Sequence, residues 1–520
     1  MTMTIEQLPD DIEALKEIIF SQHNVIQSHQ SEIENQRSEI QLKNQKIQYL
    51  LEQFTLLRHK QFAASSEVSP DQISLFDEAE QEQPVAETQT QTIAEHPRKR
   101  PVRKPLLKDL PRETVVVDLS EAEKVCDCCG GALHEMGKET REQLEFIPAQ
   151  IKVVETVRLK YSCRRCDQEG TEGQIKIAPA PTSPIPKGIA TASLLAYILI
   201  SKYQYALPLY RLEQMFANYG IEISRKTMAD WVIRCAELLK PLFDYLKNTQ
   251  LKQPILHADE TPVQVIHNDK QKSYMWVYCT GTDSPHPTNP IHNIVLYDFQ
   301  PSRSAQCVQN YLSDYAAYLQ VDGYAAYEHT SATLVGCMAH VRRKFIEAQK
   351  AQPNGKTGKA DWAVNRIQKL YAIESQSKEL TPDARHQQRG EKALPLLIEF
   401  KEWLDKSLLT VPPKTALGTA LAYAVNQWQK VIRYTDDGRL NIDNNRAERA
   451  IKPFVIGRKN WLFSNTEKGA GASAVIYSII ETAKANSINT DAYLKMLLEE
   501  LPKRQQGQAI GDLAPWAFKG

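Results

Sequence analysis

The chain of 520 residues is too long for one compact core, and its length predicts two to four domains. Its 63 basic and 63 acidic side chains cancel, so composition alone gives no argument for binding nucleic acid. The sequence contains neither the run of about 18 apolar residues that a membrane span needs nor the basic flank and apolar stretch of a secretory leader. We therefore expect a cytoplasmic protein.

The first predicted element is a long helix with a heptad repeat. Apolar residues recur every seven positions, as in the a positions of a coiled coil, at Ile12, Ile19, Ile26, Ile33, Ile40, Ile47 and Phe54. The companion d positions are apolar only at the two ends and read Leu15, Gln22, His29, Gln36, Lys43, Leu50 and Leu57. Buried polar groups weaken a zipper but discriminate between alignments, so the pattern predicts self-association. A single helix that packs on its own protein is the alternative.

A linker of uneven charge follows this helix. Residues 61–97 contain eight acidic side chains and no lysine or arginine, and their polar composition predicts disorder. Basic residues come directly afterwards, at Arg98, Lys99, Arg100, Arg103 and Lys104. Such a segment is either a solvated linker or an arm that contacts DNA phosphates without reading the base sequence.

Four of the nine cysteines form two Cys-x2-Cys pairs, at Cys126, Cys129, Cys163 and Cys166. Each pair can supply two thiolates from a tight turn, and four thiolates suit tetrahedral zinc, so the sequence predicts a structural zinc ribbon. The alternating residues between the pairs are typical of its strands. Cys128 is an extra thiol inside the first pair and leaves open which sulfurs bind the metal.

A helical region is predicted next. Residues 189–219 have a helical pattern that Gly220 ends, and Ser224 is a good N-cap for a second helix through Trp231 to Leu239. Arg225 and Lys226 stand at the start of this second helix. The arrangement is that of a helix-turn-helix, although many ordinary helical hairpins have the same pattern.

The segment PILHADETP, residues 254–262, predicts a buried strand that ends in a carboxylate. The apolar pair Ile255 and Leu256 leads to two adjacent acids, Asp259 and Glu260, and Pro262 is expected to disturb regular strand pairing. An acid at the end of a core strand is costly to bury unless something, often a metal ion, neutralises it. Because successive strand residues face opposite sides, the two acids are not expected to share one site equally.

Further strands are predicted at 274–280, 293–299, 318–321 and 334–338, with a helix at 304–312. The strand at 318–321 leads directly to Asp322, so a second apolar strand also ends in a carboxylate. Residues 361–434 are predicted to be a helical insertion. Glu448 follows on a later helix, where Asn445, three residues before it, would make it a capping-box partner in the simplest interpretation. Helices at 472–486 and 491–501 complete the chain.

Two aspartates at strand ends and a glutamate on a later helix are the ligands that two-metal phosphoryl transfer requires. Hard oxygen ligands of this kind select magnesium or manganese rather than zinc. Acidic residues are common, so spacing alone leaves this interpretation open.

Several long segments resemble the large transposase protein of the insertion-sequence 66 family. They include LPDDIEALK, FAASSE, LFDEAE, RKPLLKDLPRE, YSCRRC, ATASLLAYILISKYQYALPLYRLEQMF, HADETPV, VDGYAAY, CMAHVRRKF, DNNRAERAIKPFVIGRKNWLF and YSIIETAKANSI. Together these segments extend over residues 8–516, which is nearly the whole chain.

The resemblance implies a multidomain α+β protein with a ribonuclease-H-like catalytic core of the Asp-Asp-Glu class, which uses Mg²⁺ or Mn²⁺ to cut and join DNA. On the matching positions the catalytic and metal-binding triad falls at Asp259, Asp322 and Glu448, which are 63 and 126 residues apart. The resemblance also implies structural Zn²⁺, homo-oligomers, and two small accessory proteins of the same element as further partners.

The expected domains follow from these patterns and the resemblance. They are a coiled-coil multimerisation helix at 8–60, an acidic then basic linker at 61–112, the zinc ribbon at 113–180, a helix-turn-helix-like region at 185–250, the catalytic core at 251–465 with its insertion at about 355–435, and a C-terminal helical tail at 466–520.

Basic residues near the predicted triad are candidate contacts to DNA phosphates, with a solvated basic face as the alternative for each. In addition to Arg225, Lys226 and the basic linker, they are Arg342, Arg343, Lys344, Arg446, Arg449, Lys452, Arg458 and Lys459. His340 has two open interpretations, as a residue that positions DNA or metal-bound water and as a structural histidine.

We therefore expect a bacterial DNA transposase that cleaves the phosphodiester backbone at the element ends and transfers the 3′ hydroxyl to target DNA. It is expected to be nucleoid-associated when bound to DNA and to have no membrane partner. Two alternatives stay open. One is a non-catalytic DNA-binding regulator derived from a transposase, and the other is a structure-specific nuclease on the same core, which cuts but does not join strands.

Overall fold

The computed structural model describes residues 9, 11–62, 114, 118, 120, 124, 128, 150–161, 176–267, 272–281, 292–351, 358–505 and 507–518. The chain divides into two units, one made of Met1–Ser65 with Arg158–Gly520 and the other of Ser66–Val157. The acidic and basic linker from residue 63 to 112 and all four cysteines of the predicted zinc site lie outside the described residues. Cys128, which is described, is an exposed free thiol.

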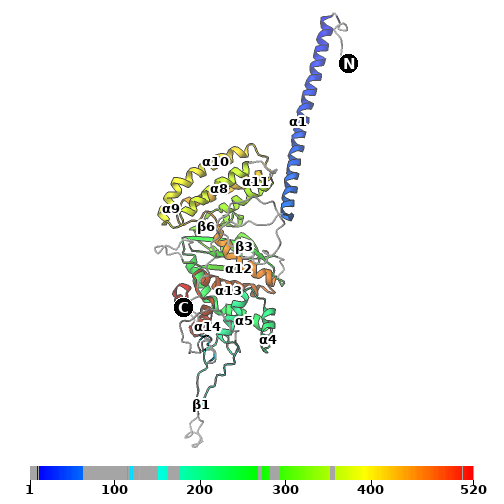
Figure 1. Cartoon of the computed structure of the whole chain (residues 1–520). Helices are drawn as coiled ribbons and strands as arrows, with labels where there is room; N and C mark the ends of the chain where they lie inside the picture. Colours follow the sequence, from blue (N-terminus) through cyan, green and yellow to red (C-terminus); the bar gives the residue numbers. More distant parts are fainter. Residues whose placement is uncertain are drawn as a thin grey trace. The chain divides into compact units, whose positions relative to one another are not determined.

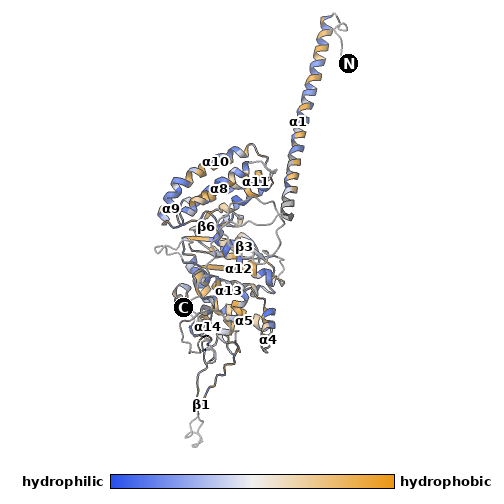
Figure 2. Ribbon diagram, in the orientation of Figure 1, coloured by the Kyte–Doolittle hydropathy of each residue, from blue (hydrophilic) through white to orange (hydrophobic). Residues whose placement is uncertain are grey.

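The N-terminal helix α1 extends over Ile12–Phe62 (Figure 1). Its heptad residues from Ile12 to Phe54 are exposed, and between 49% and 69% of each is accessible. Apolar and polar residues alternate along this helix (Figure 2). The predicted long helix is therefore present, and its apolar seam is accessible to a partner.

Three helices form the region before the sheet, α3 (Ala192–Tyr203), α4 (Leu209–Asn218) and α5 (Arg225–Gln250). The prediction of a single helix over 189–219 is wrong. The helix is interrupted at Ala206, which has a φ of 57°, and Pro208 is the N-cap of α4. The Ser224 side chain accepts a hydrogen bond from the Thr227 N–H, so the predicted cap is confirmed. α5 is longer than predicted, because its apolar face remains buried as far as Leu246.

The central sheet has five strands in the order β5-β4-β3-β6-β7. The strands are β3 (Ile255–Val263), β4 (Ser273–Cys279), β5 (Val295–Gln300), β6 (Tyr318–Gln320) and β7 (Thr333–Val335). β3, β4 and β5 are antiparallel, whereas β3, β6 and β7 are parallel. A separate pair, β1 (Lys160–Tyr161) and β2 (Lys176–Ile177), lies within the predicted ribbon.

The prediction that β3 ends in its carboxylate and that Pro262 disturbs its pairing is wrong, since Pro262 pairs with Tyr274 of β4 and the strand continues to Val263. A proline lacks an N–H, and a strand tolerates it where one edge makes no ladder hydrogen bonds. β6 pairs with β3 only as far as His257, so Pro262 lies where β3 has a single neighbour. The last strand is also shorter than predicted, because Met338 begins a helix, α7 (Met338–Lys350).

Apolar side chains from the two faces of the sheet enter different cores. Val277 and Tyr297 lie in one core with α5, α12 (Asn445–Trp461), α13 (Glu467–Ala485) and α14 (Thr490–Glu500). Leu256 and Trp276 lie in a second core with α6 (Ala305–Leu312). The apolar colouring of the strands and of α13 agrees with their burial (Figure 2). The sheet is thus covered on both faces.

The helices of the region between β7 and α12 share a further core with α7. They are α8 (Lys359–Gln376), α9 (Pro382–Gln388), a π-helical turn (Arg389–Ala393), α10 (Leu394–Leu408) and α11 (Ala416–Val431), and they lie together in Figure 1. The fully buried Arg389 side chain pairs with Glu374 and donates to the Tyr434 and Leu440 carbonyls. This arginine fixes the segment that returns to the sheet. No helix among the described residues is long and apolar enough to cross a membrane.

Candidate active site

Asp259 lies in the middle of β3, and Asp322 follows the end of β6, the parallel strand beside it. The register pairs His257 of β3 with Gln320 of β6, and two residues further along it places the aspartates opposite each other. The Asp322 Oδ1 accepts the Tyr324 N–H at 3.0 Å. Gly323, between them, has a φ of +95°, and a Cβ there would lie 3.1 Å from the Gln427 side chain, so the turn after Asp322 requires glycine.

Glu260 points to the opposite face of the sheet, as the alternation of strand residues predicts. Its side chain is only 2% exposed. It accepts a hydrogen bond from Arg303 Nε at 2.9 Å, a second from Arg303 Nη2, and one from the Tyr327 hydroxyl at 2.8 Å. Arg303 in turn stacks on Tyr324, 3.7 Å from the ring centroid. Glu260 therefore has partners within the fold, which oppose the rise of its pKa that burial causes.

Asn444 fixes the start of α12 against β3. Its amide donates to the Ala258 carbonyl at 2.8 Å, and its Oδ1 lies 3.2 Å from His257 Nδ1. The preceding residues are also anchored, since Gln320 Nε2 donates to the Asp443 carbonyl at 2.8 Å. The helix consequently begins beside Asp259, and Glu448 lies in its first turn.

The capping box predicted for Asn445 is wrong, because Asn445 is the first residue of α12 rather than its cap. The cap position belongs to Asn444, whose side chain contacts β3 and makes no capping hydrogen bond. The Asp443 Oδ1 accepts the Asn445 N–H at 3.1 Å instead. Glu448 is thus not used as a helix-capping group.

The carboxyl groups of the three acids act on one another electrostatically. Burial raises the pKa of Asp259 to about 8, with further contributions from the charges of Glu260, Asp322 and Glu448 and an opposing one from the Glu260 N–H. The side chains that act on this pKa are thus all acidic. A carboxylate in such surroundings favours either protonation or a bound cation.

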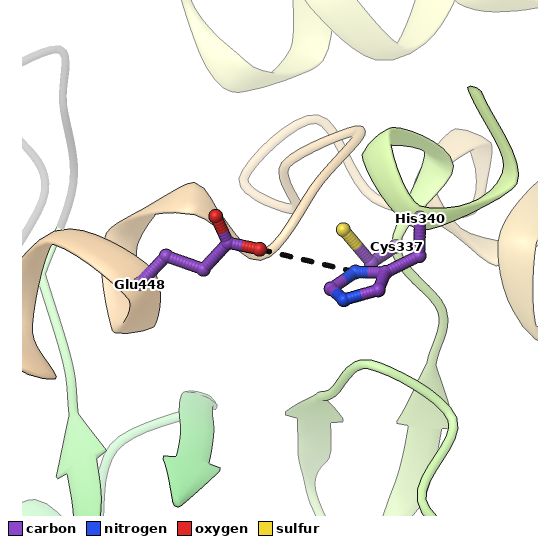
Figure 3. A group of neighbouring side chains, drawn as sticks. All are labelled: Cys337, His340 and Glu448. Carbon is purple, nitrogen blue, oxygen red and sulfur yellow. Dashed lines mark ion pairs between the residues drawn. The ribbon is translucent and has the colours of Figure 1, made fainter. Parts of the chain in front are cut away.

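One group of three metal-type donors lies within 4.8 Å of one another in the described part of the chain, and it consists of Cys337, His340 and Glu448. The three carboxylates of the predicted triad do not form such a group. His340 of α7 and Glu448 of α12 point toward each other, with 3.9 Å between Nδ1 and Oε1 (Figure 3). Burial, together with the Arg343 charge, lowers the pKa of His340, against the opposing effect of Asp322 and Glu448. His340 therefore lies beside two of the three acids.

Cys337 accepts a backbone hydrogen bond in this site. Its sulfur accepts the Asn444 N–H at 3.2 Å, and burial raises the pKa of the thiol to about 12. It is 2% exposed, so it is a protonated thiol that links the start of α7 to the start of α12.

The predicted phosphate contacts fall into two groups. Arg458 Nη1 donates to the Thr261 hydroxyl at 2.9 Å and to the Pro262 carbonyl, and Arg446 Nη1 donates to the Thr280 carbonyl at 3.3 Å. These two arginines connect α12 to the sheet. The remaining candidates in the described region lie on helix surfaces, exposed at Arg225, Lys226, Arg449, Lys452 and Lys459 and half-buried at Arg342, Arg343 and Lys344.

Basic residues continue along the faces of α12 and α7 that carry Glu448 and His340. Lys452 and Lys459 follow Glu448 by four and eleven positions, so they lie on the same face of α12. On α7, Arg343 and Lys344 follow His340 by three and four positions. Arg343 Nη2 is 3.7 Å from Glu448 Oε1. The acidic strand ends are thus bordered by two basic helix faces.

The residues that sequence reasoning missed are those that connect distant segments. His257, Gln320, Cys337 and Asn444 hold the helices on the strand ends. Two of them could have been found from their position near the acids in the sequence. His257 precedes Asp259 by two residues, and Asn444 precedes Glu448 by four.

Comparison with known families places nearly the whole chain in one group. The family model described as transposase IS66 family matches residues 187–472, and the zinc-finger binding domain of transposase IS66 matches residues 123–167. The model described as transposase C of IS166 homeodomain matches residues 49–115, and the IS66 C-terminal element matches residues 478–516.

Similar curated proteins come from Sinorhizobium fredii (strain NBRC 101917 / NGR234). The uncharacterized protein y4hP is 32% identical over 453 residues, which cover 84% of this chain and 80% of that protein. The uncharacterized protein y4qI is 30% identical over 549 residues, which cover 100% of this chain and 99% of that protein.

Proposed function

Because the chain belongs to the IS66 family of transposases, we propose that it binds the ends of its insertion element, cleaves the DNA backbone there and transfers the 3′ hydroxyl ends to target DNA. The observation that carries the proposal is the closeness of Asp259 and Asp322 on adjacent parallel strands, with Glu448 near enough for its charge to raise the pKa of Asp259. The mixed five-stranded sheet supports a ribonuclease-H-like core for this chemistry.

The site fits divalent cations bound by oxygen. Asp259 of β3 and Asp322 beyond β6 are carboxylates of adjacent strands, and Glu448 of α12 is close enough for its charge to act on Asp259. Oxygen donors of this kind suit Mg²⁺ or Mn²⁺, and a cation relieves the repulsion that raises the pKa of Asp259. When bound, such ions would supply activation of the attacking oxygen and stabilisation of the leaving oxygen.

The side chains around these acids orient the DNA in this proposal. The strand ends and Asn444 fix the positions of Asp259 and Glu448 relative to each other. Lys452 and Lys459 on α12, with Arg342, Arg343 and Lys344 on α7, bind phosphates on either side of the scissile bond. Arg446 and Arg458 act on DNA only indirectly, because they hold α12 on the sheet.

The N-terminal parts recognise the element end and join subunits. The zinc-finger match at 123–167 supports structural zinc held by Cys126, Cys129, Cys163 and Cys166. Arg225 and Lys226, exposed at the start of α5, contribute to end binding together with the basic linker. The exposed heptad seam of α1 supports a homo-oligomer, and two small accessory proteins of the element are further proposed partners.

The test is cleavage of DNA that carries the element end, with Mg²⁺ or Mn²⁺, by the wild type and by Asp259→Asn. The wild type is expected to cut and the variant to lose the activity. Equal activity of the two proteins would refute the catalytic assignment and favour a DNA-binding regulator. In a strand-transfer assay the wild type is expected to join the cut end to target DNA, and cutting without joining would favour a nuclease.

The zinc site has a separate test. Cys163→Ser is expected to lose zinc in a metal analysis of the purified protein, whereas Cys235→Ser, which changes a buried thiol of α5, is the matched control and is expected to keep it. Zinc retained by Cys163→Ser would contradict the assignment of that ligand.

A further inference from the structure

We infer that His340 supplies a nitrogen ligand to a divalent cation that it shares with Glu448. This inference rests on the proposed function, because it adds a nitrogen donor to the carboxylates of the proposed site. His340 lies in the first turn of α7, which follows β7, and it faces the first turn of α12 (Figure 3).

The distance between the two groups favours a shared ion over a direct hydrogen bond. His340 Nδ1 and Glu448 Oε1 are 3.9 Å apart, which exceeds the length of a hydrogen bond. Metal–ligand bonds of about 2.1 Å place two ligand atoms of one ion roughly 3.0 to 4.2 Å apart, according to the angle at the ion. The observed separation falls within that range.

The Nδ1 atom of His340 is buried and has no hydrogen-bond partner among the described residues. A buried polar atom without a partner is costly, and a water or an ion that completes the site is the usual explanation. The atom is directed at a carboxylate whose other near neighbour is the Arg343 guanidinium, 3.7 Å away. Glu448 therefore has an arginine on one side and, on the other, a buried imidazole nitrogen that an ion could join to it.

Cys337 is the third member of the group with His340 and Glu448, but its sulfur already accepts a hydrogen bond from the backbone. Its sulfur is buried and accepts the Asn444 N–H at 3.2 Å, so it holds the backbone of α12. The available donors are one imidazole and the carboxylates. Magnesium prefers oxygen ligands only, whereas imidazole suits transition ions, so this donor set favours Mn²⁺ over Mg²⁺.

The experiment uses the full-length protein with its zinc and adds Mn²⁺ as the probe. Pulsed electron paramagnetic resonance detects nitrogen bound directly to Mn²⁺. The wild type is expected to show this nitrogen signal and His340→Gln to lose it, with at least about a tenfold weaker affinity for Mn²⁺. The matched control His329→Gln changes an exposed histidine and is expected to keep the signal.

A nitrogen signal that persists in His340→Gln, or Mn²⁺ binding by the wild type without one, would overturn the inference. Absence of any Mn²⁺ binding would overturn it too. The proposed function is judged separately by cleavage with the wild type and Asp259→Asn. A wild type that cuts in Mg²⁺ but shows no nitrogen signal would keep the function and refute the ligand.

A second observation, on α1, points to the direction in which two copies pair. We infer that the seam of α1 docks a second copy of this chain in parallel. Parallel pairing stacks isoleucine on isoleucine in every a layer from Ile12 to Ile47, and β-branched a residues favour parallel dimers. Antiparallel pairing along the full length would place the central isoleucines against polar d residues, which include Gln22, His29, Gln36 and Lys43.

The charges that flank the seam agree with the parallel direction. In parallel helices a g residue faces the e residue five positions later in the partner. This rule pairs Asp11 with Lys16 and Glu32 with Arg37, which are attractive. In the antiparallel arrangement Glu32 would face Glu39 or itself.

Single cysteines in the full chain test the direction. Ile12→Cys and Phe54→Cys are each expected to form a disulfide between two copies under mild oxidation, beyond the level of the wild type. Ile33→Cys lies near the middle and is expected to crosslink in both directions, so it reports pairing itself. Crosslinking of Ile33→Cys without the other two would overturn the parallel direction, and failure of all three would overturn the pairing.

Discussion

The two faces of the sheet treat two neighbouring carboxylates in opposite ways. Glu260 is surrounded by Arg303 and Tyr327, which satisfy its charge within the fold. Asp259, one residue earlier, has no basic partner acting on it among the described residues, and burial, followed by the charges of Glu260, Asp322 and Glu448, raises its pKa to about 8. The same chemical group thus has an arginine and a tyrosine as partners on one face, whereas on the other it is the proposed ligand of a cation.

The contrast teaches how an acid at a strand end can be classified. An acid with a local basic partner contributes to folding, and breaking the pair harms stability. An acid among acids opposes folding and is retained for another purpose. Substitution of the two residues is therefore expected to separate activity from stability.

The largest expected effect is on cleavage of element-end DNA. Asp259→Asn removes a proposed metal ligand and is expected to lower the cleavage rate by roughly 1,000-fold or more. Glu260→Gln keeps the shape of the structural acid and is expected to stay within about tenfold of the wild type at a temperature where both are folded. Equal losses of cleavage rate in the two variants would contradict the assignment of a catalytic role to Asp259 and a structural role to Glu260.

The next effect is on stability in the presence of metal. A ligand that binds only the folded state raises the free energy of unfolding, by about 2.7 kcal/mol at a hundred times its Kd. Added Mn²⁺ is expected to raise the melting temperature of the wild type and to leave that of Asp259→Asn nearly unchanged. Glu260→Gln serves as the control and is expected to respond like the wild type.

Glu260→Gln itself is expected to be less stable than the wild type by about 1 to 3 kcal/mol, because Arg303 loses its charged partner. Denaturant unfolding of the metal-free protein measures this loss. Arg303→Lys, which keeps the charge but not the paired geometry, should show a smaller loss. An unchanged unfolding midpoint in both variants would mean that the pair contributes nothing.

The raised pKa of Asp259 predicts that the folded state loses stability as the pH rises. Its pKa is 3.8 in the unfolded chain and about 8 in the folded protein, so the folded state binds more protons between these values. Rising pH therefore destabilises the wild type through this range, and the full penalty is present above about pH 8. Asp259→Asn removes the penalty, so its advantage in melting temperature over the wild type should grow from about pH 5 to pH 9 in magnesium-free buffer. An advantage that shrinks with pH would contradict the raised pKa.

The smallest expected effect distinguishes two basic residues of α12. Lys452→Ala removes an exposed charge on the same face of α12 as Glu448 and is expected to weaken DNA binding. The slope of the logarithm of the binding constant against the logarithm of the salt concentration is expected to become shallower by about 1. Arg458→Ala removes the contacts to Thr261 and Pro262, so it is expected to lower the melting temperature more than Lys452→Ala does. Titration of labelled DNA at several salt concentrations, with melting curves for both variants, measures the difference.

Much of the fold is predictable because it follows from local patterns. The apolar runs at Ile255 and Tyr318 predict strands, and each leads to an acid, which the structure places within β3 at Asp259 and just beyond β6 at Asp322. The heptad spacing predicts α1, and Ser224 predicts the start of α5. The break at Ala206 was missed, because residues on both sides of it continue the helical pattern.

The site is predictable only in part, since its geometry depends on contacts between distant segments. Nothing near Cys337 in the sequence indicates that its sulfur accepts the N–H of Asn444, more than a hundred residues away. Arg458 resembles a DNA contact until the structure places it against Thr261. The alternation along β3, by contrast, correctly separated Asp259 from Glu260 because it is a property of every strand.

The long helical segment between Asp322 and Glu448 also affects a chain that is still being synthesised. Domains generally form as the ribosome delivers them, and the sheet strands up to β7 emerge well before α12. A nascent or prematurely terminated chain thus carries two of the three acids, and the anchor at Asn444 has yet to be made. The order of synthesis postpones the complete set of proposed catalytic acids until nearly the whole protein exists.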